Sequence, residues 1–127
     1  MPKQRDEGPR SGRITGIGGV FFRAKHREDL ADWYHQVLDL PISDSGSAQL
    51  GTTVWAAFDH TTNYFGPNRQ AYMVNYRVDD LDAALRRLRA AGATVGSDVQ
   101  EDEYGRFAWA EDPEGIRFEL WQPADGM

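Results

Sequence analysis

Glu119 is the residue best placed for acid–base chemistry. Its acidic side chain lies among the large apolar residues of the segment IRFELWQ, near the end of the chain. Side chains alternate between the two faces of a strand, so Glu119 shares a face with Arg117 and Trp121. Burial among aromatic walls raises the pKa of a carboxyl group, and such a group can act as a general base. Glu119 is therefore the candidate catalytic residue. The alternative is a purely structural salt bridge to an arginine.

The remaining residues that commonly ligate metals do not form a recognisable site. The chain has three histidines and no cysteine, which excludes disulfides, thiolate ligands and cysteine nucleophiles. His26 follows a predicted strand, and His35 lies off the apolar stripe of a predicted helix. His60 ends a strand beside Asp59, and strand neighbours point to opposite faces. We interpret all three as surface residues, and Glu103 as a solvated loop carboxylate.

Strand alternation also predicts which side chains face a cleft. These combine aromatic walls with a few convergent polar groups, as small-molecule sites do. The arginines among them can bind a carboxylate or phosphate, or can neutralise Glu119. Phe107 is either a further wall or packs against a helix or a second subunit. The candidate ligand-binding residues are Phe21, Arg23, Trp55, Phe58, Met73, Asn75, Arg77, Tyr104, Arg106, Trp109, Arg117 and Trp121.

Two similar runs of elements position these residues. The first is a strand over 17–24 followed by an amphipathic helix over 28–39, and the second is a strand over 71–78 followed by a helix over 80–91. Each helix leads into further β-prone segments. The pattern predicts a single α+β domain of two strand–helix–strands modules with a cavity between their sheets. The apolar stripe expected to pack the first helix on the core is Leu30, Trp33, Tyr34, Val37 and Leu38.

The chain length of 127 residues fits one domain. Residues 1–13 carry almost no apolar side chains and are expected to form a disordered tail. The domain is expected over 14–123, with a short C-terminal tail over 124–127. Its last two strands, 105–111 and 116–122, are joined by Asp-Pro-Glu-Gly, which suits a β-turn.

The formal net charge of −6 argues against nucleic acid as a partner, because phosphate binding needs a basic face. It is compatible with a cationic or neutral small ligand. No apolar run approaches the roughly 18 residues that span a bilayer, and the N-terminus lacks the apolar core of a secretory signal. A cytoplasmic location with no membrane partner is the expectation.

Four segments carry a family resemblance: GGVFFRA, LADWYHQVLDLPI, VNYRVDDLDAALRRLRAAGATV and EYGRFAWAEDPEGIRFELWQP. They resemble the vicinal oxygen chelate superfamily, which includes glyoxalases, bleomycin-resistance proteins and extradiol dioxygenases. The resemblance implies two βαβββ modules that form a curled mixed sheet around a cleft, with the helices outside, and a homodimer. The most specific of the four segments is the closing hairpin, and together they cover roughly residues 14–123.

The resemblance also implies where metal-dependent members hold their ion. Glu119 matches the last-strand ligand, whereas Gly19 and Met73 stand where such members carry histidine. The remaining position falls at Ala56, or one strand step away at Phe58. One carboxylate does not hold a first-row metal, so no cofactor is expected. The alternative is a divalent Zn, Ni, Mn or Fe ion held by Glu119 with ligands from elsewhere.

Three functions remain open at this point. The first is a metal-independent protein that binds a small molecule in the cleft between the modules, as bleomycin-resistance members do. The second is a metal-dependent lyase, isomerase or dioxygenase that uses Glu119 as ligand or base. The third is a metal-free catalyst with Glu119 as general base. The sequence does not name the ligand or substrate.

Overall fold

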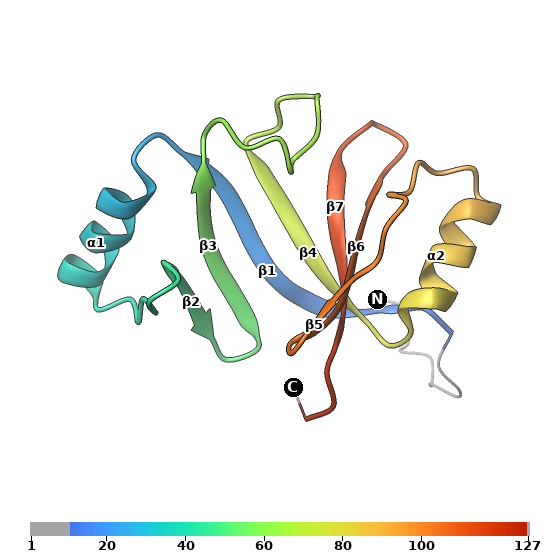
Figure 1. Cartoon of the computed structure of the whole chain (residues 1–127), viewed down its shortest axis with the longest axis horizontal. Coiled ribbons are helices and arrows are strands. Elements are labelled where there is room, and N and C mark those ends of the chain that lie inside the picture. The colour runs from blue at the N-terminus through green and yellow to red at the C-terminus, as the bar shows by residue number, and fades with distance from the viewer. Residues whose placement is uncertain (1–10, 127) are drawn as a thin grey trace, which may run out of the picture.

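The computed structural model describes residues 11–126, so most of the predicted N-terminal tail lies outside the described residues (Figure 1). Neither described helix is long and apolar enough to cross a membrane. The elements are β1 Ile14–Ala24, α1 Arg27–Leu38, β2 Ser47–Leu50, β3 Thr53–Asp59, β4 Tyr72–Val78, α2 Leu81–Ala90, β5 Gln100–Asp102, β6 Gly105–Glu111 and β7 Arg117–Pro123.

The strands form one curled mixed sheet in the order β2-β3-β1-β4-β7-β6-β5. In each half, the first strand pairs in parallel with the last strand of the same half, β1 with β3 and β4 with β7. The halves meet where β1 and β4 pair antiparallel. Helices α1 and α2 lie outside the sheet at its two ends (Figure 1). The predicted α+β fold of two modules around a concave face is therefore confirmed.

Helix α2 packs on the second module as its pattern predicts. Leu81 and Leu85 are buried against Val78 and Leu120 on the outer face of the sheet. The helix begins after Asp80, whose carboxylate accepts a hydrogen bond from the Ala83 N–H at 3.1 Å. This cap satisfies one of the amide groups that have no partner within the helix.

Helix α1 departs from its predicted core packing. Trp33, Val37 and Leu38 are 52%, 56% and 65% exposed, so the expectation that they belong to the core is wrong. The helix meets the sheet through Tyr34, whose ring lies 5.4 Å from that of Trp55 on β3. Val37 and Leu38, one turn further along, stay exposed.

Candidate functional site

The segment 60–71 between β3 and β4, here called the cover loop, occupies one half of the concave face. It arches above the strands in Figure 1. Its Phe65 is fully buried and packs with Phe21 and Met73, and the Phe58 ring lies 5.2 Å from that of Phe65. This half of the cleft is therefore filled with protein.

Two arginines predicted to bind ligand hold the cover loop instead. Arg23 donates hydrogen bonds to the backbone oxygens of Gln70 and Thr62, at 2.9 and 2.6 Å, and its guanidinium lies 5.0 Å from the centre of the Phe65 ring. Arg117 donates to the backbone oxygen of Tyr64 at 3.1 Å. The Gln70 side chain pairs with the backbone N–H and C=O of Arg117. These contacts connect the loop to both modules.

Glu119 lies beneath the cover loop and is 7% exposed. The Tyr64 hydroxyl donates to one of its carboxylate oxygens, and Asn75 Nδ2 donates to the other at 2.7 Å. Burial raises the pKa of Glu119, and the two hydrogen bonds oppose that increase. Burial and the nearby carboxylate also raise the pKa of Tyr64.

The salt bridge considered for Glu119 is not what the structure shows. The ion pair of Arg117 is with Glu111, at 3.6 Å. The register explains this, because Glu111 lies directly opposite Arg117 across the β6–β7 pair, whereas Trp109 lies opposite Glu119. Glu119 is thus held by neutral donors.

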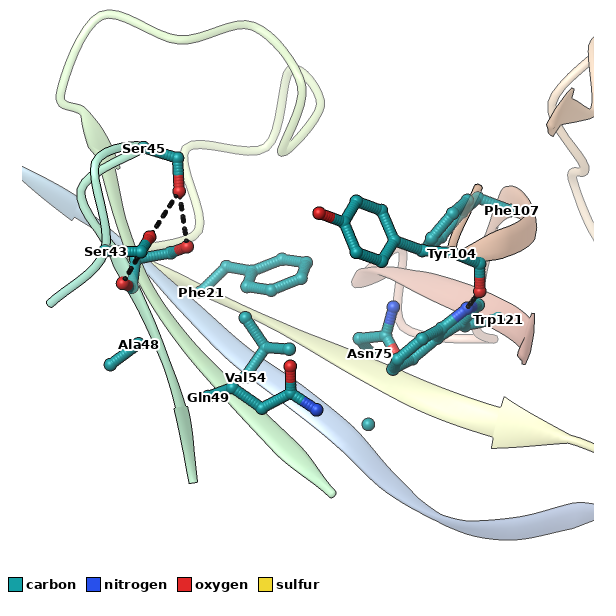
Figure 2. Close-up of a pocket in the computed structure, with 12 residues that line it drawn as sticks. Phe21, Ser43, Ser45, Ala48, Gln49, Val54, Asn75, Tyr104, Phe107 and Trp121 are labelled. Carbon is teal, nitrogen blue, oxygen red and sulfur yellow. Dashed lines mark hydrogen bonds between the residues drawn. The ribbon is translucent and has the colours of Figure 1, made fainter. Parts of the chain in front are cut away.

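The other half of the concave face is an open cavity of about 400 Å³ between the two modules (Figure 2). The rings of Phe107 and Trp121 stack with their centres 5.6 Å apart and an interplanar angle of 11°, and together they form an aromatic wall of the cavity. Trp121 Nε1 donates to the backbone oxygen of Tyr104 at 2.8 Å, which fixes the indole. Every described residue that lines the cavity is uncharged: Gly18, Phe21, Ser43, Ser45, Ser47, Ala48, Gln49, Val54, Asn75, Tyr104, Phe107 and Trp121.

The floor of the cavity depends on a glycine. Gly18 is the extra residue of a bulge in β1, where the pairing with β4 shifts between Ile17 and Gly19. A Cβ at position 18 would overlap Asn75 Oδ1 and crowd the Trp121 ring. Only glycine lets the strand, the amide and the indole lie this close.

Three serines across the cavity from Trp121 were missed by the sequence analysis. Ser43, Ser45 and Ser47 all line the cavity, and the Ser45 hydroxyl is hydrogen bonded to those of both other serines. Ser43 and Ser45 are labelled in Figure 2. Ser47 and Gln49 share one face of β2, but Ser43 and Ser45 lie in the turn before it, where strand alternation gives no signal. Tyr64 was also missed, because its loop has no periodic pattern.

The structure brings four of the twelve candidate ligand-binding residues to the cavity, namely Phe21, Asn75, Tyr104 and Trp121. Phe58 and Met73 pack with Phe65 of the cover loop, and Arg23 and Arg117 fasten that loop.

The other four candidates do not line the cavity. They are Arg77, Trp109, Trp55 and Arg106. Arg77 stacks over Trp121 at 4.7 Å and donates to the backbone oxygen of Thr52. The guanidinium of Arg117 covers Trp109 at 3.5 Å.

Trp55 and Arg106 point away from the concave face, which corrects their predicted positions. Trp55 contacts Tyr34 and Phe22 on the outer face, because its neighbours in β3 occupy the inward positions. Arg106 pairs with Asp82 of α2 at 3.0 Å. It precedes the inward-facing Phe107 and therefore points outward.

The residues present do not fit the metal site of metal-dependent relatives. Met73 is buried in an apolar cluster, and Gly19 offers no side chain. Both oxygens of Glu119 accept hydrogen bonds from the protein. Between residues 11 and 126, no group of three or more histidine, aspartate or glutamate side chains is arranged to hold a metal ion.

A family model described as a glyoxalase-like domain matches residues 19–121, which is most of the chain. The chain belongs to this glyoxalase-like family. It thereby falls within the vicinal oxygen chelate superfamily, as the sequence resemblance indicates. The chain matches no curated protein sequence at a significant level.

Solved structures share the fold of this glyoxalase-like domain. Methylmalonyl-CoA epimerase from Mycobacterium tuberculosis superposes with a TM-score of 0.64 at 22% identity, covering 87% of this chain and 89% of that one. A variant of the Streptomyces coelicolor epimerase in complex with 2-nitronate-propionyl-CoA gives 0.68 at 16% identity, covering 88% and 99%. A hypothetical protein from Bacillus halodurans gives 0.65 at 9% identity, covering 92% and 98%. At these identities the likeness shows the fold alone.

Proposed function

We propose that this glyoxalase-like protein binds a small molecule with a flat apolar body in the cavity between its modules, without a His-ligated metal. The observation that carries the proposal is the stacked Phe107–Trp121 wall of an uncharged cavity. Its volume of about 400 Å³ lies in the range of ligand sites, roughly 300–1,000 Å³. Ring stacking on such a wall adds to the free energy of apolar burial.

The metal-independent form of this proposal rests on the positions that relatives use for ligands. Gly19 and Met73 supply no donor there, and Glu119 is already held by Tyr64 and Asn75. Glu119 does not border the cavity. We assign it a positioning role, in which it orients the Asn75 amide at the cavity floor and fastens the cover loop. General base catalysis by Glu119 is the alternative.

The solved neighbours include epimerases bound to CoA esters. A CoA ester carries phosphate groups, which proteins commonly bind with arginine or lysine. The described lining of this cavity offers neither. The described arginines that contact lining residues are Arg77, which covers the Trp121 ring and donates to the backbone oxygen of Thr52, and Arg27, which donates to the backbone oxygen of Ser45. A smaller ligand without phosphate therefore fits the cavity better.

A homodimer is part of the proposal. Trp33, Val37 and Leu38 expose large apolar side chains on the single helix α1, and a second copy would cover them. Light scattering of the wild type and of Trp33→Glu tests this, because a charge in the interface would convert a dimer to a monomer. A wild-type monomer would contradict the dimer and leave the cavity proposal intact.

The binding proposal can be tested by NMR, because the chain has four tryptophans and their indole N–H signals report separate places. The protein is dialysed against EDTA and titrated with the neutral probe 1-naphthylacetamide. We expect a saturable shift of the assigned Trp121 signal, with little change at Trp33 on α1. No shift of Trp121 by this or related aromatic probes would contradict the proposed function. Binding that appears only after a divalent metal is restored would contradict its metal independence.

A further inference from the structure

The direction of the hydrogen bonds among the three serines can be worked out from their partners. Ser43 Oγ lies 3.0 Å from the backbone oxygen of Ser47, and a carbonyl oxygen can only accept. The single hydroxyl proton of Ser43 is therefore engaged. Ser45 Oγ, 2.8 Å away, must then donate to Ser43. Ser47 Oγ must in turn donate to Ser45, at 2.9 Å.

The consequence is that the serine trio, Ser43 with Ser45 and Ser47, uses all three of its protons internally. Each hydroxyl oxygen has two lone pairs. Ser43 and Ser45 each accept one hydrogen bond within the trio, whereas the Ser47 hydroxyl oxygen accepts none. The trio therefore faces the cavity with free acceptor positions and no free O–H.

The donors among the other polar groups of the lining are partly engaged by the protein. Trp121 Nε1 donates to the Tyr104 backbone oxygen. The amide nitrogens of Asn75 and Gln49 each use one of their two N–H groups, on Glu119 and on the backbone oxygen of Gly51, so Gln49 offers the cavity one N–H as well as its carbonyl oxygen. Asn75 Oδ1 is buried and has no hydrogen-bond partner among the described residues. The Tyr104 hydroxyl at the half-exposed rim can either donate or accept.

We propose that the cavity selects hydrogen-bond donors: planar aromatic molecules that carry an N–H or O–H group, neutral or cationic. The ring lies along the Phe107–Trp121 wall, and the donor reaches the serine trio on the opposite side (Figure 2). A carboxylate or phosphate ligand would bring its own acceptor oxygens against the serine hydroxyl oxygens, with no proton between them. The net charge of −6 on the protein adds long-range repulsion of an anionic ligand. This inference rests on the proposed function and names its ligand class.

A matched series of four naphthalenes tests the inference and separates hydrogen-bond donation from charge. 1-Naphthylmethylamine is a cationic donor, and 1-naphthylacetamide is a neutral donor. 1-Acetonaphthone is a neutral acceptor, and 1-naphthylacetate is an anionic acceptor. Titrations at pH 7 monitor the Trp121 indole signal. We expect both donors to bind about tenfold more tightly than the ketone, which corresponds to one well-made hydrogen bond, and the carboxylate to bind most weakly.

Two serine variants test the trio itself. Ser47→Ala removes the oxygen with the most free acceptor capacity, so it should weaken the amine and amide several-fold and leave the ketone unchanged. Ser43→Ala removes the group that takes the Ser45 proton. Ser45 can then donate to a ligand, so the ketone and carboxylate should gain affinity relative to the amide. Ser97→Ala, at an exposed serine outside the cavity, is the matched control.

The outcomes separate the two proposals. Binding of the ketone or carboxylate as tightly as the amide, in the wild type, would overturn the donor-selective cavity while supporting a small-molecule site. Unchanged selectivity in a folded Ser43→Ala variant would also overturn it. No Trp121 shift with any of the four compounds would overturn the proposed function itself.

Discussion

Replacement of Tyr64 by phenylalanine removes the hydroxyl that donates to Glu119, and it leaves the aromatic ring at position 64 and the Glu119 carboxylate in place. Tyr64→Phe should therefore destabilise the protein. A hydrogen bond to a charged group contributes roughly 1.5–3 kcal/mol, and one to a neutral group about 1 kcal/mol. Since Glu119 is 7% exposed, water replaces the lost donor poorly. We expect a loss near 2 kcal/mol where Glu119 is ionised.

The loss should depend on pH. Burial raises the folded-state pKa of Glu119, so the folded protein binds a proton more tightly than the unfolded chain does. The stability from this group is fully present below the unfolded pKa and is lost as pH rises through the folded pKa. The Tyr64 hydrogen bond holds the folded pKa down. Its removal raises that pKa further, so the cost of Tyr64→Phe should grow from about 1 kcal/mol in acid to its full value above the folded pKa.

Urea denaturation at a series of pH values measures this cost. Tyr72→Phe is the matched control, because it also removes one tyrosine hydroxyl but at a residue that is 64% exposed. The control should change the free energy of unfolding by less than about 0.5 kcal/mol. A Tyr64→Phe variant that behaves like the control at every pH would refute the view that this hydroxyl stabilises the Glu119 carboxylate.

Four further substitutions test other parts of the structure. Gly18→Ala should cost about 1–3 kcal/mol and weaken probe binding, because the added methyl group overlaps Asn75 Oδ1; unchanged titrations would contradict this. Asp80→Ala removes the α2 cap and should cost about 1 kcal/mol of unfolding free energy in urea. Leu85→Ala should cost about 2–5 kcal/mol because Leu85 is 3% exposed. Leu38→Ala, at 65% exposure, should cost less than about 0.5 kcal/mol if the protein is monomeric, and a larger cost would place Leu38 in an interface.

Much of the fold could be predicted from the sequence because its signals are local. The helix expected over 80–91 and the Asp-Pro-Glu-Gly turn each depend on residues within a few positions of one another. Strand alternation also identified the inward positions of Phe21, Asn75 and Glu119. These side chains follow the two-residue period of a strand whatever the partner strand is.

Only the tertiary structure decided what those inward side chains contact. Arg23 and Glu119 face the concave side as expected, but Arg23 and one oxygen of Glu119 find their partners in the cover loop, more than 35 residues away from each along the chain. No periodic pattern predicts where an irregular loop folds back, because its position depends on which buried groups it can satisfy. The exposed face of α1 is a similar case, since an amphipathic stripe does not say how much sheet lies opposite.

The cover loop therefore fills half of the open cleft that was predicted between the modules. The balance of hydrogen-bond donors and acceptors in the remaining cavity is not revealed by residue types alone. The sequence by itself determined the family, the two modules and the absence of ligands at Gly19 and Met73. The three-dimensional arrangement decided that the Ser43 proton goes to the Ser47 carbonyl oxygen. A hydroxyl can donate or accept, and only its neighbours in space determine which capacity remains for a ligand.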